Sequence, residues 1–197
     1  TAQALLANMA GMYVVYHGPE GIKEIAEDIH TGAAYLSKNL KKMGYNQENE
    51  IFFDTLKINL PQGVKSTEIK KISEAAQINF YYPSDSVVII STDETTREEE
   101  LNEILNVFGI VAKKSFQRSP KLEKICTIPD QYLRTDSYLE HEVFHKYRSE
   151  TELMRYIRKL ERKDFSLTHS MISLGSCTMK LNAATQLFPV GFAEFAN

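Results

Sequence analysis

The segment TLKINL, residues 55–60, decides the fold of this chain. Its apolar residues alternate with polar ones, which is the period of a strand with one buried face. The segments INFYY and VVIIS, residues 78–82 and 87–91, are rich in β-branched and aromatic residues, and the turn-forming PSDS between them predicts a hairpin. Together they predict a small, mainly antiparallel sheet.

Two helices are expected among these strands. Ser66 can cap a short helix after the first strand. Thr96 with Glu99 predicts a capping box for a second helix, which Gly109 would close. The apolar face of this second helix consists of Leu101, Ile104, Leu105 and Phe108. The order over residues 50–109 is β-α-β-β-α, so we expect an α/β chain of the α+β kind, with helices on one face of an antiparallel sheet.

Helices are also expected before the sheet. Residues 2–16 are apolar nearly all round, which predicts a buried helix that Gly18 and Pro19 terminate. The next helix has an apolar stripe at alternating three- and four-residue steps and ends at Gly44. The stripe consists of Ile22, Ile25, Ile29, Ala33, Leu36, Leu40 and Met43.

Residues 110–148 lose this periodicity and are interpreted as a connector laid over a surface. Basic residues are frequent in its first half, and we interpret them as solvated rather than as a partner site. They are Lys113, Lys114, Arg118, Lys121 and Lys124. After the connector, Ser149 and Glu152 predict a second capping box and a helix with a basic far end.

Composition excludes several classes of protein. A chain of 197 residues can bury a core and hold one domain or two small ones. The net charge of -3 gives no reason to expect nucleic acid as a partner, and no apolar run approaches the ~20 residues of a membrane helix. Cys126 and Cys177 form no disulfide framework, which fits a reducing compartment. The sequence shows no signal or transit segment and no initiator methionine, so we expect an excised segment.

Residues 141–145, HEVFH, match the H-E-x-x-H pattern of zinc proteases. That pattern needs a helix on which both imidazoles share one face. The match is short and lies in the connector, so we interpret it as an exposed His-Glu pair with Phe144 packed inward, and we expect no metal site.

The run MISLGSCTMKLN, residues 171–182, carries the candidate site. Gly175 allows close backbone approach, and the hydroxyls, the carboxamide and the lysine suit a small, polar, anionic ligand. The candidate pocket residues are Ser176, Cys177, Thr178, Lys180 and Asn182. We expect Cys177 to line the pocket wall rather than act as a nucleophile, because no histidine is clearly paired with it.

Several motifs resemble one family along the whole chain. They are KDFSL at 163–167, the run at 171–182, FP at 188–189, EFAN at 194–197, the opening TAQALLAN, YHGPEG at 16–21 and SETE at 149–152. In this order they are similar to glycine dehydrogenase (decarboxylating), the pyridoxal-phosphate-dependent P-protein of the glycine cleavage system. That family is much longer and joins two aminotransferase-like halves, so this chain resembles an internal fragment.

The resemblance implies a fold-type-I transferase-like architecture that releases carbon dioxide from glycine. The remaining aminomethyl group would pass to the lipoyl arm of the H-protein. It implies a helical lead-in at 1–49, the small domain of the non-catalytic half at 50–109, a connector at 110–148 and the start of the catalytic half at 149–197. The lysine that holds pyridoxal phosphate would lie outside this chain, so the chain contains no catalytic residue and the fragment alone would be inactive. Further partners would be the rest of the P-protein chain, or a second subunit, in a dimer. The location would be cytoplasmic in a bacterium and mitochondrial in a eukaryote, with the cytoplasm preferred.

Two other functions stay open from the residues alone. A β-α-β-β-α order is most of a ferredoxin-like sandwich, so residues 50–109 could form an amino-acid-binding regulatory module. The apolar helix at 2–16 could instead mark a structural or dimer-contact segment.

Overall fold

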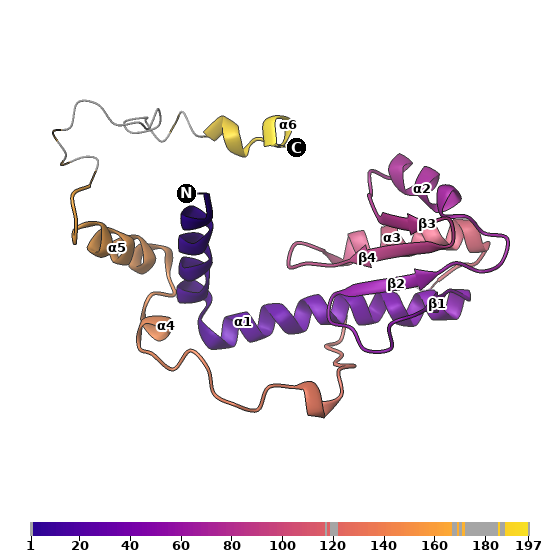
Figure 1. Ribbon diagram of the computed structural model, residues 1–197, viewed down its shortest axis with the longest axis horizontal. Helices are drawn as coiled ribbons and strands as arrows, with labels where there is room; N and C mark the ends of the chain where they lie inside the picture. The colour runs from indigo at the N-terminus through magenta and orange to yellow at the C-terminus, as the bar shows by residue number, and fades with distance from the viewer. Residues whose placement is uncertain are drawn as a thin grey trace. The chain divides into compact units, whose positions relative to one another are not determined.

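The computed structural model describes residues 2–116, 118, 122–166, 169, 171, 185 and 188–196. The chain divides into two compact units. We call His17–Glu140 the sheet unit, and Thr1–Tyr16 with His141–Asn197 the terminal unit. The elements of both units are labelled in Figure 1.

Helix α1, Ala2–Met43, is interrupted at Gly18, whose φ of 63° and ψ of -177° lie in a region that essentially only glycine adopts. The break falls at the predicted helix stop, and Gly44 follows the helix end with a φ of 95°, as expected. We call the part of α1 before Gly18 its first half and the part after Gly18 its second half. The second half buries the last four members of the predicted apolar stripe, which are Ala33, Leu36, Leu40 and Met43. The periodicity therefore identified the face that packs on the sheet.

Four antiparallel strands form one sheet in the order β1-β2-β4-β3. They are β1 Asn46–Gln47, β2 Thr55–Asn59, β3 Tyr81–Ser84 and β4 Val87–Ser91. Leu56 pairs with Ile90 and Ile58 with Val88, so these buried side chains share one face. Helix α2 connects β2 to β3 along the chain, but β4 lies between these two strands in the sheet. The predicted β-α-β-β-α order is confirmed; the two-residue strand β1 was not predicted.

Helices α2, Ser66–Ala75, and α3, Glu98–Ala112, complete the sheet unit. They join the second half of α1 on the apolar face of the sheet, so the predicted placement of helices on one face is confirmed. The core that they share includes Leu36, Leu40, Leu56, Ile58, Ile69, Val88, Ile90, Leu101, Leu105 and Phe108.

The predicted N-terminal caps of both helices were wrong by one residue. Helix α3 begins after Arg97, whose backbone N–H donates to the Glu100 carboxylate at 2.6 Å, so Thr96 and Glu99 do not form the capping box. Ser66 is the first residue of α2 rather than its cap. The N–H of the preceding Lys65 donates to the Glu68 carboxylate at 3.4 Å.

Gly109 does not end α3, as the sequence predicted, because the helix continues to Ala112. Lys113 then adopts a left-handed φ of 54°, and the chain turns back so that the Lys114 N–H donates to the Gly109 carbonyl at 3.0 Å. A Cβ atom at position 109 would lie 2.7 Å from the Lys114 carbonyl oxygen. Close approach of backbone to backbone therefore requires the glycine.

We expect Gly109→Ala to lower the free energy of unfolding by about 2 kcal/mol, because the new methyl must displace a backbone carbonyl. Gly11→Ala is the matched control, since a Cβ there meets nothing within 4 Å and alanine favours a helix interior by about 1 kcal/mol. Urea titrations followed by circular dichroism measure both. Equal stabilities for the two variants would contradict the role of close approach at Gly109.

Beyond α3, the described chain continues as a connector with one short 3-10 helix, η1, Asp130–Tyr132. The terminal unit then contains α4 Val143–Lys146, α5 Glu150–Glu161, η3 Phe188–Gly191 and α6 Ala193–Ala196. Ser149 caps α5, because its Oγ accepts from the Glu152 N–H at 3.3 Å. The Glu152 carboxylate accepts from the Ser149 hydroxyl at 3.1 Å rather than from the backbone, so only the serine half of the predicted capping box is confirmed. The expectation of a buried helix at 2–16 was wrong for this chain, since residues 3–11 are exposed.

Candidate functional site

The candidate pocket residues lie outside the part of the chain that the structure describes. This holds for Ser176, Cys177, Thr178, Lys180 and Asn182, which fall within 172–184. Their roles stay predictions.

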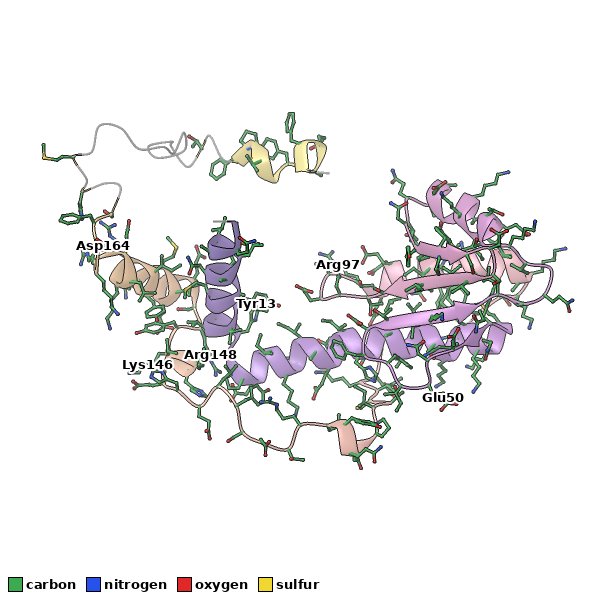
Figure 2. All side chains as sticks on the ribbon, in the orientation of Figure 1. Tyr13, Glu50, Arg97, Lys146, Arg148 and Asp164 are labelled. Atoms are coloured by element: carbon green, nitrogen blue, oxygen red, sulfur yellow. The ribbon has the colours of Figure 1, made fainter. Side chains whose placement is uncertain are left out.

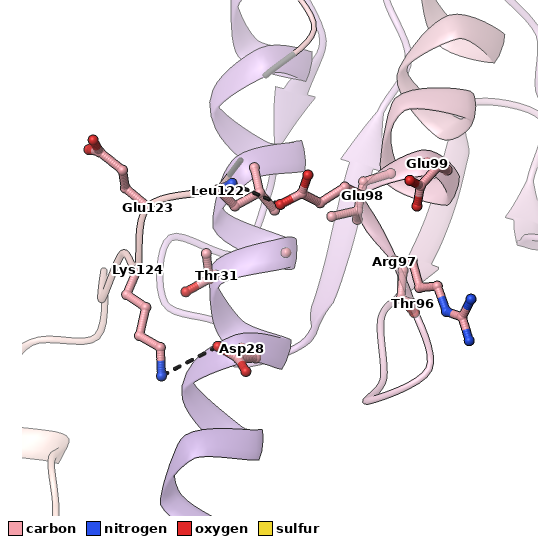
Figure 3. A pocket seen from close by; sticks show the side chains of 11 residues that line it. Asp28, Thr31, Thr96, Arg97, Glu98, Glu99, Leu122, Glu123 and Lys124 are labelled. Carbon is pink, nitrogen blue, oxygen red and sulfur yellow. Dashed lines mark hydrogen bonds and ion pairs between the residues drawn. The ribbon is translucent and has the colours of Figure 1, made fainter. Parts of the chain in front are cut away.

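A described pocket of about 960 Å³ lies in the sheet unit, between the second half of α1, the start of α3 and the connector (Figure 3). It is lined by Asp28, Thr31, Gly32, Thr96, Arg97, Glu98, Glu99, Leu101, Leu122, Glu123 and Lys124. Four of these side chains are acidic and two are basic.

Two charged groups of this pocket hold the connector in place. The Lys124 ammonium lies 3.2 Å from Glu27 Oε2 and 3.5 Å from Asp28 Oδ1. The hydrogen bond to Glu27, with the charge and hydrogen bond of Asp28, raises the pKa of Lys124. The Glu98 carboxylate accepts from the Leu122 N–H at 2.9 Å (Figure 3). These groups are therefore occupied by contacts within the protein.

The described pocket does not suit pyridoxal phosphate. That cofactor needs a lysine amine that bonds to its aldehyde carbon, and donors or cations for its phosphate. Lys124 is the one lysine among the described lining residues, and its carboxylate partners favour the protonated, non-nucleophilic form. Glu98, Glu99 and Glu123 would repel a phosphate.

His30 is an anchoring residue that sequence reasoning missed. Its side chain is 3 % exposed, and both ring nitrogens have partners. Nδ1 lies 2.8 Å from the Phe53 carbonyl oxygen, and Nε2 accepts from the Thr127 N–H at 2.9 Å. Because a carbonyl can only accept, the proton is assigned to Nδ1. One ring therefore joins α1, the loop before β2 and the connector.

Thr31 reinforces this anchor on the same helix. Its Oγ1 accepts from the Ile125 N–H at 3.2 Å. Together with Lys124 and the bond from Leu122 to Glu98, these contacts fix residues 122–127 along the second half of α1 and the start of α3. In the sequence, His30 and Thr31 are polar residues beside the apolar stripe, and no pattern indicates which residues they bind.

The HEVFH segment does not have the geometry of the protease motif. Helix α4 begins at Val143, so His141 precedes it, and His141 Nδ1 accepts from the Val143 N–H at 3.2 Å. Glu142 forms an ion pair with Lys146, and the hydrogen bond between them lowers the pKa of Glu142. Figure 2 labels Lys146 and Arg148, the latter 3.3 Å from His145 Nδ1. Among the described residues, no group of three or more His, Cys, Asp and Glu side chains could hold a metal ion.

The predicted basic patch is divided in the structure. Lys124 is paired, whereas Lys113, Lys114 and Arg118 line a second pocket of about 580 Å³, whose described lining residues include no acidic side chain. The two lysines follow the C-terminal end of α3, where the helix dipole favours cations. The dipole accounts for their position without a ligand.

Comparison with known proteins identifies the family. The sequence model of the glycine cleavage system P-protein family matches residues 1–108. The chain belongs to this family. No described helix of this P-protein segment has the length and apolar character needed to cross a membrane.

Individual P-proteins are similar over nearly the whole chain. Glycine dehydrogenase (decarboxylating) of Bacteroides fragilis strain YCH46 is 49% identical over 195 residues, covering 99% of this chain and 20% of the relative. The protein of that name from Christiangramia forsetii is 47% identical over 197 residues, with coverages of 100% and 20%. The mitochondrial one of Homo sapiens is 45% identical over 198 residues, with coverages of 100% and 19%. The chain thus spans about a fifth of the length of these relatives.

Proposed function

We propose that this chain is a segment of a glycine dehydrogenase (decarboxylating) that acts in the glycine cleavage system. The observation that carries the proposal is similarity along the whole segment, at 49% identity over 99% of the chain to a protein of that name. The active protein would be longer and would take glycine as its substrate. It would release carbon dioxide and pass the aminomethyl group to the lipoyl arm of the H-protein.

Pyridoxal phosphate is the proposed cofactor of the longer protein, where it supplies an electron sink for decarboxylation. The acidic lining of the described pocket and the paired state of Lys124 support a cofactor site elsewhere than in this pocket. We propose that the cofactor lysine lies outside this chain. In this scheme residues 50–109 belong to the small domain of the non-catalytic half of a fold-type-I architecture. Residues 1–49 lead into that domain, 110–148 form the connector and 149–197 begin the catalytic half.

The run at 171–182 would contribute to the cavity of the longer protein. Ser176, Thr178 and Asn182 carry side chains that can donate hydrogen bonds to an anionic group, and Lys180 adds a positive charge. Cys177 would line the wall. Their work would be to bind and orient the substrate and to stabilise developing charge.

A chimera tests the proposal. This chain replaces the matching segment of the Bacteroides fragilis relative, and glycine decarboxylation is measured with and without added pyridoxal phosphate. We expect cofactor-dependent turnover by the chimera and none by the isolated chain. Borohydride reduction followed by peptide mapping should find no stoichiometric cofactor on the isolated chain. Modification of Lys180 at one equivalent would overturn the placement of the cofactor lysine.

In that chimera, we expect Ser176→Ala and Thr178→Ala each to reduce kcat/KM for glycine about tenfold or more. A hydrogen bond to a charged group contributes roughly 1.5–3 kcal/mol, and about 1.4 kcal/mol corresponds to tenfold. Ser37→Ala, on the second half of α1, is the matched hydroxyl control and should leave turnover unchanged. Unchanged turnover in both pocket variants would remove these residues from the cavity.

Family membership weighs against the regulatory-module alternative, because the P-protein family accounts for the flanking segments that this module leaves unexplained. We propose a dimer for the longer protein, with the remaining chain or a second subunit as partner. A cytoplasmic location is proposed for a bacterial protein, and a mitochondrial one for a eukaryotic protein.

A further inference from the structure

The two units differ in how far they bury their large apolar residues. The sheet unit buries its own core, whereas Val15 is the single buried hydrophobic among the described residues of the terminal unit. Exposed residues of the terminal unit include Leu5, Leu6, Met9, Met154, Ile157, Phe188, Val190, Phe192 and Phe195. Exposure of Leu5, Leu6 and Phe195 reaches 64%, 63% and 76%. A surface of this kind marks an interaction site.

The first half of α1 shows what environment this surface requires. Residues 2–16 carry no charged side chain, and their only strongly polar side chains are the amides of Gln3 and Asn8. A helix that is apolar all round belongs inside a protein. Helices that lie on a membrane surface carry Lys and Arg on a polar face, which this segment lacks. Its 15 residues are also shorter than the ~20 needed to span a bilayer.

Helix α5 is amphipathic rather than apolar all round. Met154 and Ile157 are exposed, while Arg155 and Lys159 lie at other positions around the helix. Such a helix packs one face on a protein and leaves the other in water. The terminal unit therefore needs a partner that encloses the first half of α1 and covers one side of α5.

We propose that the first half of α1, with the apolar residues of α5 and of 188–195, is a docking surface for the part of the same P-protein that lies outside this chain. This choice of partner rests on the proposed function, in which the chain is a segment of a longer protein. The relatives are about five times as long as this segment. A two-fold interface between copies presents one self-complementary patch. The first half of α1 is instead apolar all round, so a single patch of that kind would leave part of its apolar surface in water. The sheet unit, with its own core, folds without this partner.

Hydrogen exchange measured by mass spectrometry tests the proposal on the isolated chain and on the Bacteroides fragilis chimera. In the isolated chain we expect rapid exchange at residues 2–16 and 150–161, and slow exchange at 33–43, 55–59 and 87–91. In the chimera we expect exchange at 2–16 to slow at least 100-fold, with little change in the sheet unit. Equally fast exchange at 2–16 in both proteins would overturn the proposal.

Variants and light scattering identify the occupant. Leu6→Glu with Met9→Glu should abolish protection of 2–16 in the chimera, yet leave the unfolding midpoint of the isolated chain unchanged. Lys38→Glu, exposed on the second half of the same helix, is the control and should change neither. A dimer of the isolated chain with 2–16 protected would identify a second copy instead. Protection that appears only with anionic phosphatidylserine vesicles would identify a membrane; both outcomes overturn the proposal.

The exchange measurement separates this inference from the proposed function. A chimera that protects residues 2–16 but does not decarboxylate glycine would contradict the activity and keep the docking surface. An active chimera with unprotected residues 2–16 would support the activity and contradict the docking surface.

Discussion

Replacing His30 with leucine is expected to lower the free energy of unfolding of the sheet unit by about 3 kcal/mol. Leucine keeps an apolar side chain beside the Phe52 and Phe53 rings, which lie 5.5 Å and 6.2 Å from the imidazole. It removes the hydrogen bonds to the Phe53 carbonyl and from the Thr127 N–H. Each lost bond costs about 1 kcal/mol, and a partner left buried and unpaired costs about 1–3 kcal/mol. Urea titration by circular dichroism measures the loss.

Two amide variants separate the partners of His30. The amide nitrogen of His30→Asn can take the place of Nδ1 and donate to Phe53, whereas the longer His30→Gln can place its oxygen near Nε2 and accept from Thr127. We therefore expect faster hydrogen exchange at residues 122–127 in the asparagine variant, and faster exchange in the loop at 48–54 in the glutamine variant. Wild-type stability and exchange in His30→Leu would show that the ring does not anchor the connector.

Local patterns predicted the elements of the sheet unit, and non-local contacts decided what the patterns missed. The alternation in TLKINL identified β2 because five residues show a period of two. Strand β1 has two residues and shows no period. Three acidic residues lie at the start of α3, so the sequence alone could not show which of them accepts from the Arg97 N–H. The structure shows that Glu100 does. Gly109 was interpreted as a stop, although the approach of Lys114 requires it.

The site could be predicted less completely than the fold. The partners of His30 lie 23 and 97 residues away in the sequence, so no short-range pattern reveals them. The residues proposed for the cavity came from a motif and the chemistry of its side chains, and periodicity says nothing about them. The apolar character of 2–16 predicted burial, whereas this chain exposes Leu5, Leu6 and Met9. We attribute that discrepancy to the partner that the docking proposal places on the helix.

Alkaline pH is expected to destabilise the sheet unit through Tyr45. The Tyr45 side chain is 3 % exposed, its hydroxyl donates to the Phe108 carbonyl at 2.8 Å, and its ring packs edge-on against Phe108. Burial, with a smaller contribution from the negative charge of Glu68, raises the pKa of Tyr45 from 10.0 to about 12. A raised pKa means that the unfolded chain loses its proton first, so the contribution is complete below pH 10 and is lost as pH rises toward 12. Two pKa units correspond to about 3 kcal/mol.

Tyr45→Phe isolates this contribution from the other groups that titrate above pH 10. At pH 7 the variant should be about 1 kcal/mol less stable than the wild type, because the Phe108 carbonyl loses one donor. Between pH 10 and 12 the variant should lose less stability than the wild type, so that the order of the two reverses near the upper end. Tyr81→Phe, at an exposed position on β3, is the matched control and should follow the wild type throughout. Parallel stability curves for Tyr45→Phe and the wild type from pH 7 to 12 would show that the buried hydroxyl does not limit alkaline stability, and that other ionisations unfold the sheet unit first.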